Sequence, residues 1–193
     1  MAETLTPIWV DEEVAVAEPL QLSRWLDDSP WRQVRRCDPA ARALADRHYS
    51  RQTPGATEFM ASGRTFVLLA HDHSAVWGAI ENLDPVGNRR WRCSIFRNEG
   101  VARSSDLIRS ATALTVAYWE RRWGLPAVPL TTEVDPAKVR TKRDPGRCFL
   151  RAGWRRIGVV RGLVVLEAPT AQRLISDFEP CEDEEISRGG PRG

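Results

Sequence analysis

The sequence predicts an α+β fold in which helices pack on a mixed, mostly antiparallel sheet. Short runs rich in β-branched and aromatic residues come in neighbouring pairs, which is typical of antiparallel hairpins. One long helical pattern separates the third run from the fourth, so one connection must cross over the sheet. The expected order along the 193 residues is helix, three strands, long helix, strand, short helix and two strands, all in one domain.

The first helix is expected to begin at Pro39. Asp38 is a favourable N-cap residue, and proline is favoured at the first helical position. A loop rich in turn-forming residues follows, and then three strands. The third of these strands alternates in character, so Trp91, Cys93 and Ile95 are expected on one face. The three strands are predicted at residues 64–71, 74–82 and 90–97, the first two as a hairpin.

The strongest helical pattern covers residues 104–124, where apolar residues recur at helical spacing. Ser104 or Ser105 can cap the start of this helix. Gly124 and Pro126 are expected to stop it.

The C-terminal part predicts a strand, a short helix and a hairpin. The strand covers residues 128–134. Asp144 and Pro145 can cap a helix at 146–152, which Gly153 can end in the left-handed conformation. The last two strands are predicted at residues 154–160 and 163–168, joined by Arg161 and Gly162.

Charge is distributed unevenly along the chain. Residues 1–30 carry one arginine against seven acids, and residues 167–193 carry three arginines against seven acids. Residues 31–166 keep 24 Lys and Arg against 12 acids, a net charge of +12. Such a basic body favours nucleic acid or another polyanion as a partner, the alternative being simply solvated arginines. We therefore expect an acidic N-terminal extension (1–30), one domain (31–169) and an acidic flexible tail (170–193).

The sequence predicts a cytoplasmic protein with no membrane partner. No apolar run approaches the roughly 20 residues needed to cross a bilayer, and the acidic N-terminus lacks the basic start of a signal peptide. The four cysteines lie far apart and show no spacing typical of zinc sites. They are therefore expected to be reduced thiols.

Polar side chains stand together where the first helix is expected to end, in the stretch RHYSR at residues 47–51. Near pH 7, His48 can serve as a general base or as a metal ligand. Asp135 ends a predicted strand and supplies a second candidate, although an iron site usually takes three ligands. The alternatives are a solvated helix end for His48 and a turn cap for Asp135.

The junction between the third strand and the long helix reads RNEGVA, residues 97–102. It resembles the Gln/Arg-x-x-Gly-x-Gly/Ala turn of GNAT acyltransferases, and the predicted element order also resembles the GNAT fold. That turn binds the pyrophosphate of acyl-CoA, since backbone N–H groups at a helix N-terminus can hold phosphate. Glu99 departs from the pattern as an acidic residue beside a pyrophosphate, and a plain turn is the alternative. The resemblance implies that acyl-CoA is held by Arg97, Gly100, Ala102, Ser104 and Ser105.

A narrower resemblance covers roughly residues 37–167 and is densest at 133–158. The stretches RHYSR, RNEG…SSDLIRSA and VDPAKVRTKRDPGRCFLRAGWRRIG are similar to the Mom family of phage DNA-modification enzymes. That family is a diverged GNAT branch that converts adenine in duplex DNA to its N6-carbamoylmethyl form, and a bound iron has been proposed for it. The resemblance implies that His48, Tyr49 and Asp135 are functional, with His48 and Asp135 as the candidate metal ligands.

The most concentrated basic stretch, KVRTKRDPGR, is expected between a strand and a helix. Several cations on such a loop can follow a phosphate backbone, and a solvated loop is the alternative. The residues expected to bind double-stranded DNA are Arg51, Lys138, Arg140, Lys142, Arg143 and Arg147.

Three functions compete at this point. The first is a transferase that extrudes adenine from DNA, with Tyr49 near the base and His48 or Asp135 taking the N6 proton. The second is a GNAT N-acyltransferase that acts on a small amine or a protein. The third is a nucleic-acid-binding module without catalysis, for which His48 would be dispensable.

Overall fold

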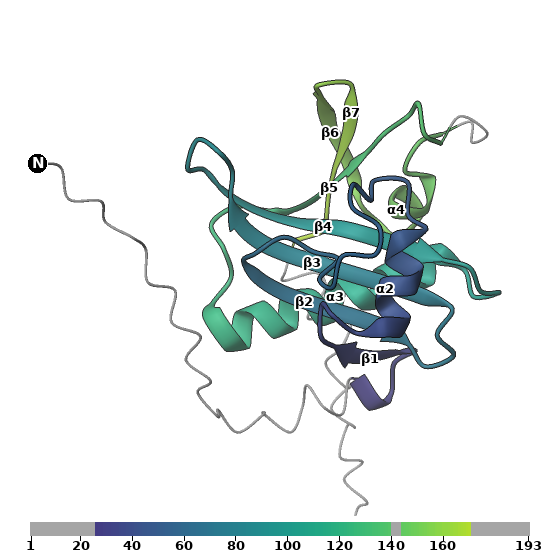
Figure 1. Ribbon diagram of the computed structural model, residues 1–193. Coiled ribbons are helices and arrows are strands. Elements are labelled where there is room, and N and C mark those ends of the chain that lie inside the picture. Colours follow the sequence, from purple (N-terminus) through teal and green to yellow (C-terminus); the bar gives the residue numbers. More distant parts are fainter. Residues whose placement is uncertain (1–25, 140–143, 171–193) are drawn as a thin grey trace, which may run out of the picture.

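A seven-stranded sheet forms the centre of the computed structural model, which describes residues 26–139 and 144–170 (Figure 1). The strands are β1 (Trp31–Val34), β2 (Arg64–Ala70), β3 (Ala75–Leu83), β4 (Arg89–Asn98), β5 (Leu130–Val134), β6 (Arg155–Val160) and β7 (Leu163–Glu167). The helices of this part of the chain are α2 (Pro39–Asp46), α3 (Ser104–Trp123) and α4 (Arg147–Arg151). The fold is therefore α+β, as the sequence predicts.

The strands lie in the order β1-β2-β3-β4-β5-β7-β6. All neighbouring strands are antiparallel except β4 and β5, which are parallel and are connected through α3. Only three residue pairs join β4 to β5, from Trp91–Leu130 to Cys93–Thr132. Because β4 continues to Asn98, the carboxyl ends of the two parallel strands are left unpaired with each other.

The expectation that Trp91, Cys93 and Ile95 share one face is wrong for Ile95. Gly78 pairs with Ile95 and Ala79 pairs with Cys93, so Ser94 is an extra residue in β4. Such a bulge interrupts the alternation of side chains along a strand. Trp91 and Cys93 consequently join the core on the α3 side, whereas Ile95 joins the smaller core on the α2 side.

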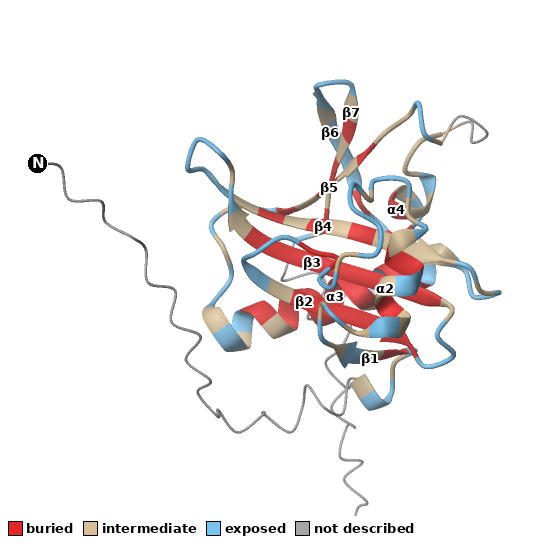
Figure 2. Ribbon diagram, in the orientation of Figure 1, coloured by how far each residue is buried: buried red, intermediate tan, exposed pale blue. Residues whose placement is uncertain are grey.

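Each face of the sheet has its own core, and the buried residues follow the centre of the sheet in Figure 2. The larger core, on the α3 side, contains several tryptophans, and polar side chains on α3 accept hydrogen bonds from three of their indole N–H groups. The three bonds are Trp31 to Ser110 (2.9 Å), Trp77 to Thr115 (3.0 Å) and Trp154 to Thr112 (3.2 Å). Buried indoles need such acceptors, which explains the polar residues on the buried side of α3.

The helix ends follow the predictions only in part. Arg103 is the N-cap of α3 and no side chain caps this helix, so neither Ser104 nor Ser105 does so. Gly146, in the left-handed conformation, is the N-cap of α4 in place of Asp144. At the other end of α4, Gly153 has a φ of 92°, as expected for a left-handed helix end.

Strand β1 is the element that the sequence did not predict, because two of its four residues are Arg32 and Gln33. It is held by pairing with β2 and by the complete burial of Trp31. Among the described residues, no helix has the length and apolar content needed to cross a bilayer. Cys37 and Cys93 are free thiols.

Candidate functional site

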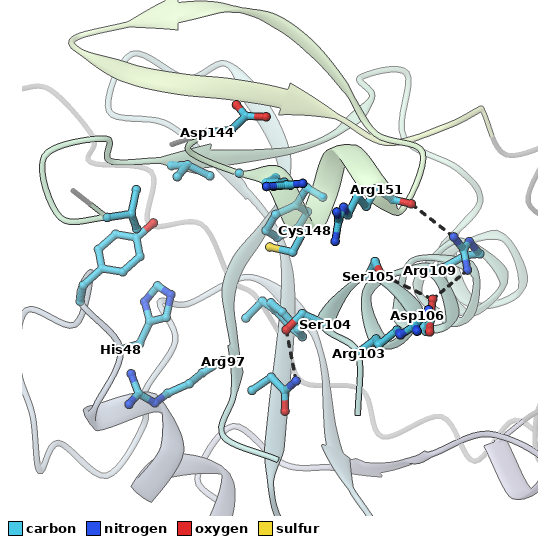
Figure 3. Close-up of a pocket in the computed structure, with 18 residues that line it drawn as sticks. His48, Arg97, Arg103, Ser104, Ser105, Asp106, Arg109, Asp144, Cys148 and Arg151 are labelled. Atoms are coloured by element: carbon cyan, nitrogen blue, oxygen red, sulfur yellow. Dashed lines mark hydrogen bonds and ion pairs between the residues drawn. The ribbon is translucent and has the colours of Figure 1, made fainter. Parts of the chain in front are cut away.

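An open cleft lies at the carboxyl ends of the parallel strands β4 and β5 (Figure 3). Its volume is ≈ 1370 Å³, and its walls also include the segment after α2, the start of α3 and α4. Ligands of α/β sheets commonly bind outside the carboxyl ends of parallel strands. The separation of β4 from β5 beyond Cys93 creates the same opening here.

His48 reaches this cleft from the segment that follows α2. Its backbone N–H donates to Ala45 O at 2.9 Å, which continues the last turn of the helix. The imidazole lies 4.3 Å from the Tyr49 ring, centroid to centroid, and its Nδ1 is 2.7 Å from Ser50 Oγ. The backbone N–H of Ser50 also donates to Nδ1, at 3.3 Å. In the other tautomer, in which Nδ1–H donates to Ser50 Oγ, Nε2 keeps a lone pair that can accept a proton.

Burial lowers the pKa of His48, and the positive charge of Arg97 lowers it further, to about 4. The imidazole is therefore neutral at pH 7, which is the form that accepts a proton. An anion bound beside Arg97 would offset that charge and raise the pKa of His48 toward its usual range.

Tyr49 and Asp135 come together although they lie far apart in the sequence. The Tyr49 hydroxyl lies beside the backbone of Asp135, and burial raises its pKa. The phenol is therefore protonated at neutral pH and can donate a hydrogen bond, while part of the ring stays exposed. The structure thus brings His48 and Tyr49 to the cleft with the backbone of Asp135 beside Tyr49, whereas Asp135 itself does not line the cleft.

The Asp135 carboxylate is also part of a turn, since its Oδ1 accepts the N–H of Ala137 at 2.8 Å. Within residues 26–139 and 144–170, no three His, Cys, Asp or Glu side chains form a group that could hold a metal. His48 and Asp135 therefore lack a third donor there. The described residues do not fit an iron site.

The RNEGVA turn is closed by its own side chains. Asn98 Oδ1 accepts the N–H of Gly100 at 2.9 Å, and Asn98 Nδ2 donates to Ala102 O at 2.7 Å. The N–H of Glu99 donates to Ser74 O at 2.8 Å. A Cβ at position 100 would overlap the Ser74 side chain, so glycine is required here by packing. Gly100 and Ala102 do not line the cleft, and the Gly100 N–H already has an acceptor.

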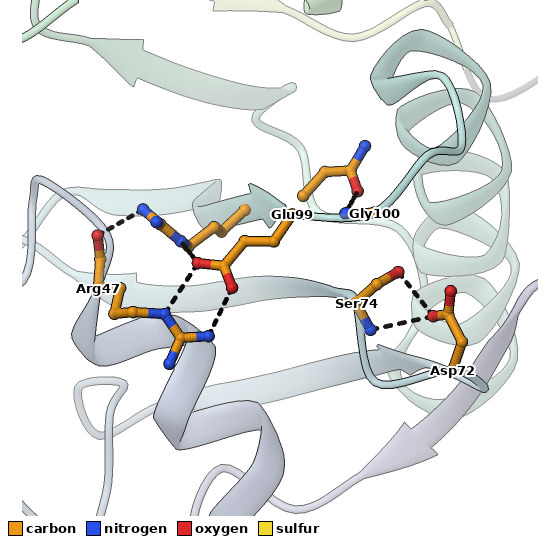
Figure 4. A network of polar contacts seen from close by, with 7 residues as sticks. Arg47, Asp72, Ser74, Glu99 and Gly100 are labelled. Atoms are coloured by element: carbon orange, nitrogen blue, oxygen red, sulfur yellow. Dashed lines mark hydrogen bonds and ion pairs between the residues drawn. The ribbon is translucent and has the colours of Figure 1, made fainter.

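The negative charge of Glu99 is compensated, because two arginines bind its carboxylate (Figure 4). Arg47 binds both oxygens, at 2.8 and 2.6 Å, and Arg97 Nε donates to Oε1 at 2.5 Å. These contacts lower the pKa of Glu99 to about 2. Arg97 also donates to the backbone oxygen of Arg47, the residue before His48. The network therefore ties the end of α2 to the end of β4.

The cleft is rich in arginine. No side chain caps α3, so the N–H groups of its first turn, at Ser104 and Ser105, lie at the cleft with the positive end of the helix dipole. The arginines that line the cleft are Arg97, Arg103, Arg109, Arg147 and Arg151, against the acids Asp106 and Asp144. Arg97 and Arg109 take part in ion pairs. The surplus of positive charge suits an anionic ligand.

The residues predicted to bind DNA separate into three groups. Arg147 lines the cleft, and Lys138 is exposed outside it. Arg51 is instead a structural residue: its side chain is 10 % exposed and donates to Asp46 at 2.8 Å and to Phe59 O at 3.3 Å. Little of its guanidinium is left for DNA. The remaining three predictions, Arg140, Lys142 and Arg143, lie outside the described residues.

Sequence reasoning missed Arg103, Arg109 and Arg151 as cleft residues. Arg151 follows Arg147 by four positions, a spacing that places both on one side of a helix, so this arginine could have been found from the sequence. Arg103 could have been found as the residue just before the long helix. Nothing local indicates Arg109, because its position depends on how α3 packs beside α4.

Comparison of the chain with protein-family models, with curated proteins and with solved structures gives no match.

Proposed function

We propose that this protein is a transferase of the Mom type, with a GNAT-like fold, that adds a small carbamoylmethyl-like group to N6 of adenine in DNA. One observation carries the proposal. His48 and Tyr49, from the segment after α2, line an arginine-rich cleft, and the backbone of Asp135, after β5, lies beside Tyr49. These are the residues that the resemblance implies, and Asp135 is far from the other two in the sequence.

The fold is compatible with this proposal. The element order that resembles GNAT acyltransferases is present, with α3 connecting the parallel strands and β7 lying between β5 and β6. The opening between β4 and β5 lies where an open α/β sheet binds its ligand.

His48 and Tyr49 each have a task in this reaction. The target adenine leaves the DNA stack and enters the cleft beside Tyr49. The Tyr49 hydroxyl donates a hydrogen bond to the base. The N6 amine attacks the group carried by an activated donor, the bond between that group and the donor breaks, and the donor's leaving group takes the electron pair. Neutral His48 accepts the proton that N6 loses. A DNA phosphate beside Arg97 raises the pKa of His48 and so makes it a better base.

The arginines position the DNA. Arg103, Arg147 and Arg151 have no ion-pair partner among the described residues, so their guanidinium groups can bind phosphate oxygens. Contacts of this kind hold the backbone on both sides of the extruded nucleotide. Binding should therefore weaken steeply as salt is raised.

The test is nucleoside mass spectrometry of DNA from bacteria that express the protein. We expect a modified deoxyadenosine with the wild type and none with His48→Ala, Tyr49→Phe or Asp135→Asn, at unchanged melting temperatures. His71→Ala is the matched control, since His71 is an exposed histidine in the β2–β3 turn. A digest of wild-type cells identical to that of empty-vector cells, with folded protein present, would contradict the proposal.

The uncapped start of α3 favours a second candidate function, that of an N-acyltransferase that uses acyl-CoA. Ser104, Ser105 and Arg103 would hold the pyrophosphate there, whereas the Gly100 N–H is already occupied. Titration with acetyl-CoA separates the two functions. Saturable binding that Arg103→Gln abolishes, together with unmodified DNA, would favour the acyltransferase.

A further inference from the structure

Strand β6 is the most exposed strand of the sheet (Figure 2). It is the last strand, so one side of its backbone has no neighbouring strand among the described residues. Ile157, Val159 and Val160 are 45 %, 58 % and 56 % exposed. Proteins usually protect an edge that combines free backbone groups with apolar side chains, because such an edge associates with other molecules.

The β6–β7 hairpin projects from the body of the molecule, and its tip is an unusual turn (Figure 1). Val160 pairs with Leu163, which leaves Arg161 and Gly162 as the two turn residues, with φ angles of 51° and 80°. This left-handed pair is the Asn-Gly type of turn, in which asparagine fits the first position best. The chain has an arginine there, which lacks the short polar side chain that helps asparagine adopt this conformation. A residue that breaks a local rule in this way suggests a function.

The hairpin tip and Asp135 lie at the same end of the β5–β7 pair. Val134, the residue before Asp135, pairs with Val164, the residue after Leu163. Val160 is the partner of Leu163 on the next strand. The backbone of Asp135 lies beside Tyr49, so the tip and the candidate catalytic cluster are at the same end of this pair.

The charge of the hairpin favours an anionic partner. Arg155 binds Glu167 at 2.5 Å, whereas Arg156 and Arg161 have no ion-pair partner in the described part of the chain. A second copy docked on this edge would bring these like charges onto one surface. A polyanion with apolar surface between its charges, such as duplex DNA, matches both the cations and the exposed valines.

We propose that the tip of the β6–β7 hairpin, residues 160–163, enters a groove of duplex DNA next to the nucleotide that occupies the cleft. This inference rests on the proposed DNA-modifying function. A two-stranded ribbon fits the major groove, and apolar side chains can support the stack that an extruded base leaves behind. Arg161 binds a backbone phosphate, and Val160, next to it in the chain, contacts the base pair beside the gap.

The decisive variant is Arg161→Asn, because it removes the charge and leaves a turn that asparagine favours. The folded state should be at least as stable as the wild type. Arg35→Asn is the matched control: Arg35 is exposed beside β1, at the opposite edge of the sheet, and makes the same change in charge. Both variants and the wild type are compared by fluorescence anisotropy on a labelled DNA duplex across a salt series.

We expect Arg161→Asn to weaken duplex binding about tenfold and to reduce the salt slope by about 0.9, the value for one lost phosphate contact. Arg35→Asn should leave the slope unchanged. Val160→Thr keeps the β-branched shape and should weaken binding a few-fold. Modified deoxyadenosine should fall with Arg161→Asn and persist with Arg35→Asn.

The outcomes separate this inference from the proposed function. If wild-type protein modifies DNA and Arg161→Asn behaves as Arg35→Asn does, the hairpin inference is wrong and the proposed function stands. If wild-type protein neither binds nor modifies DNA, both are wrong. Light scattering tests whether a second copy of the chain binds this edge instead of DNA. A dimer that Val159→Lys converts to a monomer would show that it does.

Discussion

Two glutamates of this protein each bind two arginines, one inside the fold and one at the cleft. Glu81, in β3, is 5 % exposed. Its contacts are Arg64 at 3.4 Å, Arg89 at 2.5 Å and the indole N–H of Trp119 at 2.9 Å. Because these partners come from β2, β4 and α3, the buried carboxylate joins three elements around the larger core.

Glu99 makes similar bonds in a more open setting. Its side chain is 32 % exposed, and its partners Arg47 and Arg97 are also partly exposed. Water can replace these contacts at little cost, so they contribute little to stability. They do fix the backbone of Arg47, the residue before His48. The comparison shows that a glutamate bound by two arginines supports the fold where it is buried. Where it is exposed to solvent, the same arrangement positions a neighbouring residue instead.

The largest expected effect is that of Glu81→Ala on stability. The substitution leaves the Trp119 indole N–H buried without an acceptor and removes two ion pairs, which should lower the free energy of unfolding by about 2–4 kcal/mol. Urea denaturation measures this change. Glu58→Ala is the control, since it removes an exposed ion pair with Arg36 and should cost less than about 1 kcal/mol. Equal losses in the free energy of unfolding for the two variants would show that the buried glutamate contributes no more to stability than an exposed one.

A second effect on stability is expected from pH. The pKa of His48 is about 4 in the folded protein, against an ordinary value of 6.5. Between these values the unfolded chain binds a proton that the folded protein does not, so stability falls as the pH falls from 6.5 to 4. The His48→Ala variant should lose less stability over this pH range, because it has no imidazole to bind the proton. Urea titrations of both proteins at several pH values measure it, and parallel curves would show that His48 keeps an ordinary pKa.

The smallest effect on stability is expected from Glu99→Gln. This variant should melt near the wild-type temperature but yield about tenfold less modified deoxyadenosine, because the segment before His48 is held less firmly. Its stability relative to the wild type should also depend on pH. The carboxylate contributes stability above pH 4.5, and this contribution is lost as the pH falls toward 2.

Glu58→Gln serves as the control for modification, because Glu58 binds an arginine away from the cleft. Full modification by Glu99→Gln would show that the open cluster does not position His48. A large loss of stability in that variant would instead place Glu99 with Glu81 as a structural residue.

The sequence predicted the elements well where a local signal exists. Asp38 does cap α2, accepting hydrogen bonds from the N–H groups of Ala40 and Ala41 at 2.9 Å. The left-handed Gly153 ends α4, with the N–H of Trp154 bonded to Phe149 O at 3.1 Å. These signals depend on residues a few positions apart.

Features that depend on distant contacts were missed. Ser94 has no local signal for a bulge, because the register is set by the pairing of β3 with β4. Arg51 looked like a free cation, but the fold places it against Asp46. At the candidate site, the sequence named His48, Tyr49 and Asp135 through a resemblance, whereas the pairing of Glu99 with Arg47 required the structure.

The three-pair connection between β4 and β5 has a consequence for how the protein folds. Strands β2, β3 and β4 pair with sequence neighbours through short turns, and so do β6 and β7. Such local hairpins form within microseconds. The parallel pair closes only after the whole of α3 is in place, and contacts that span a long loop form late. Because the cleft lies between these two strands, we expect it to be absent from folding intermediates and to appear only with the native state.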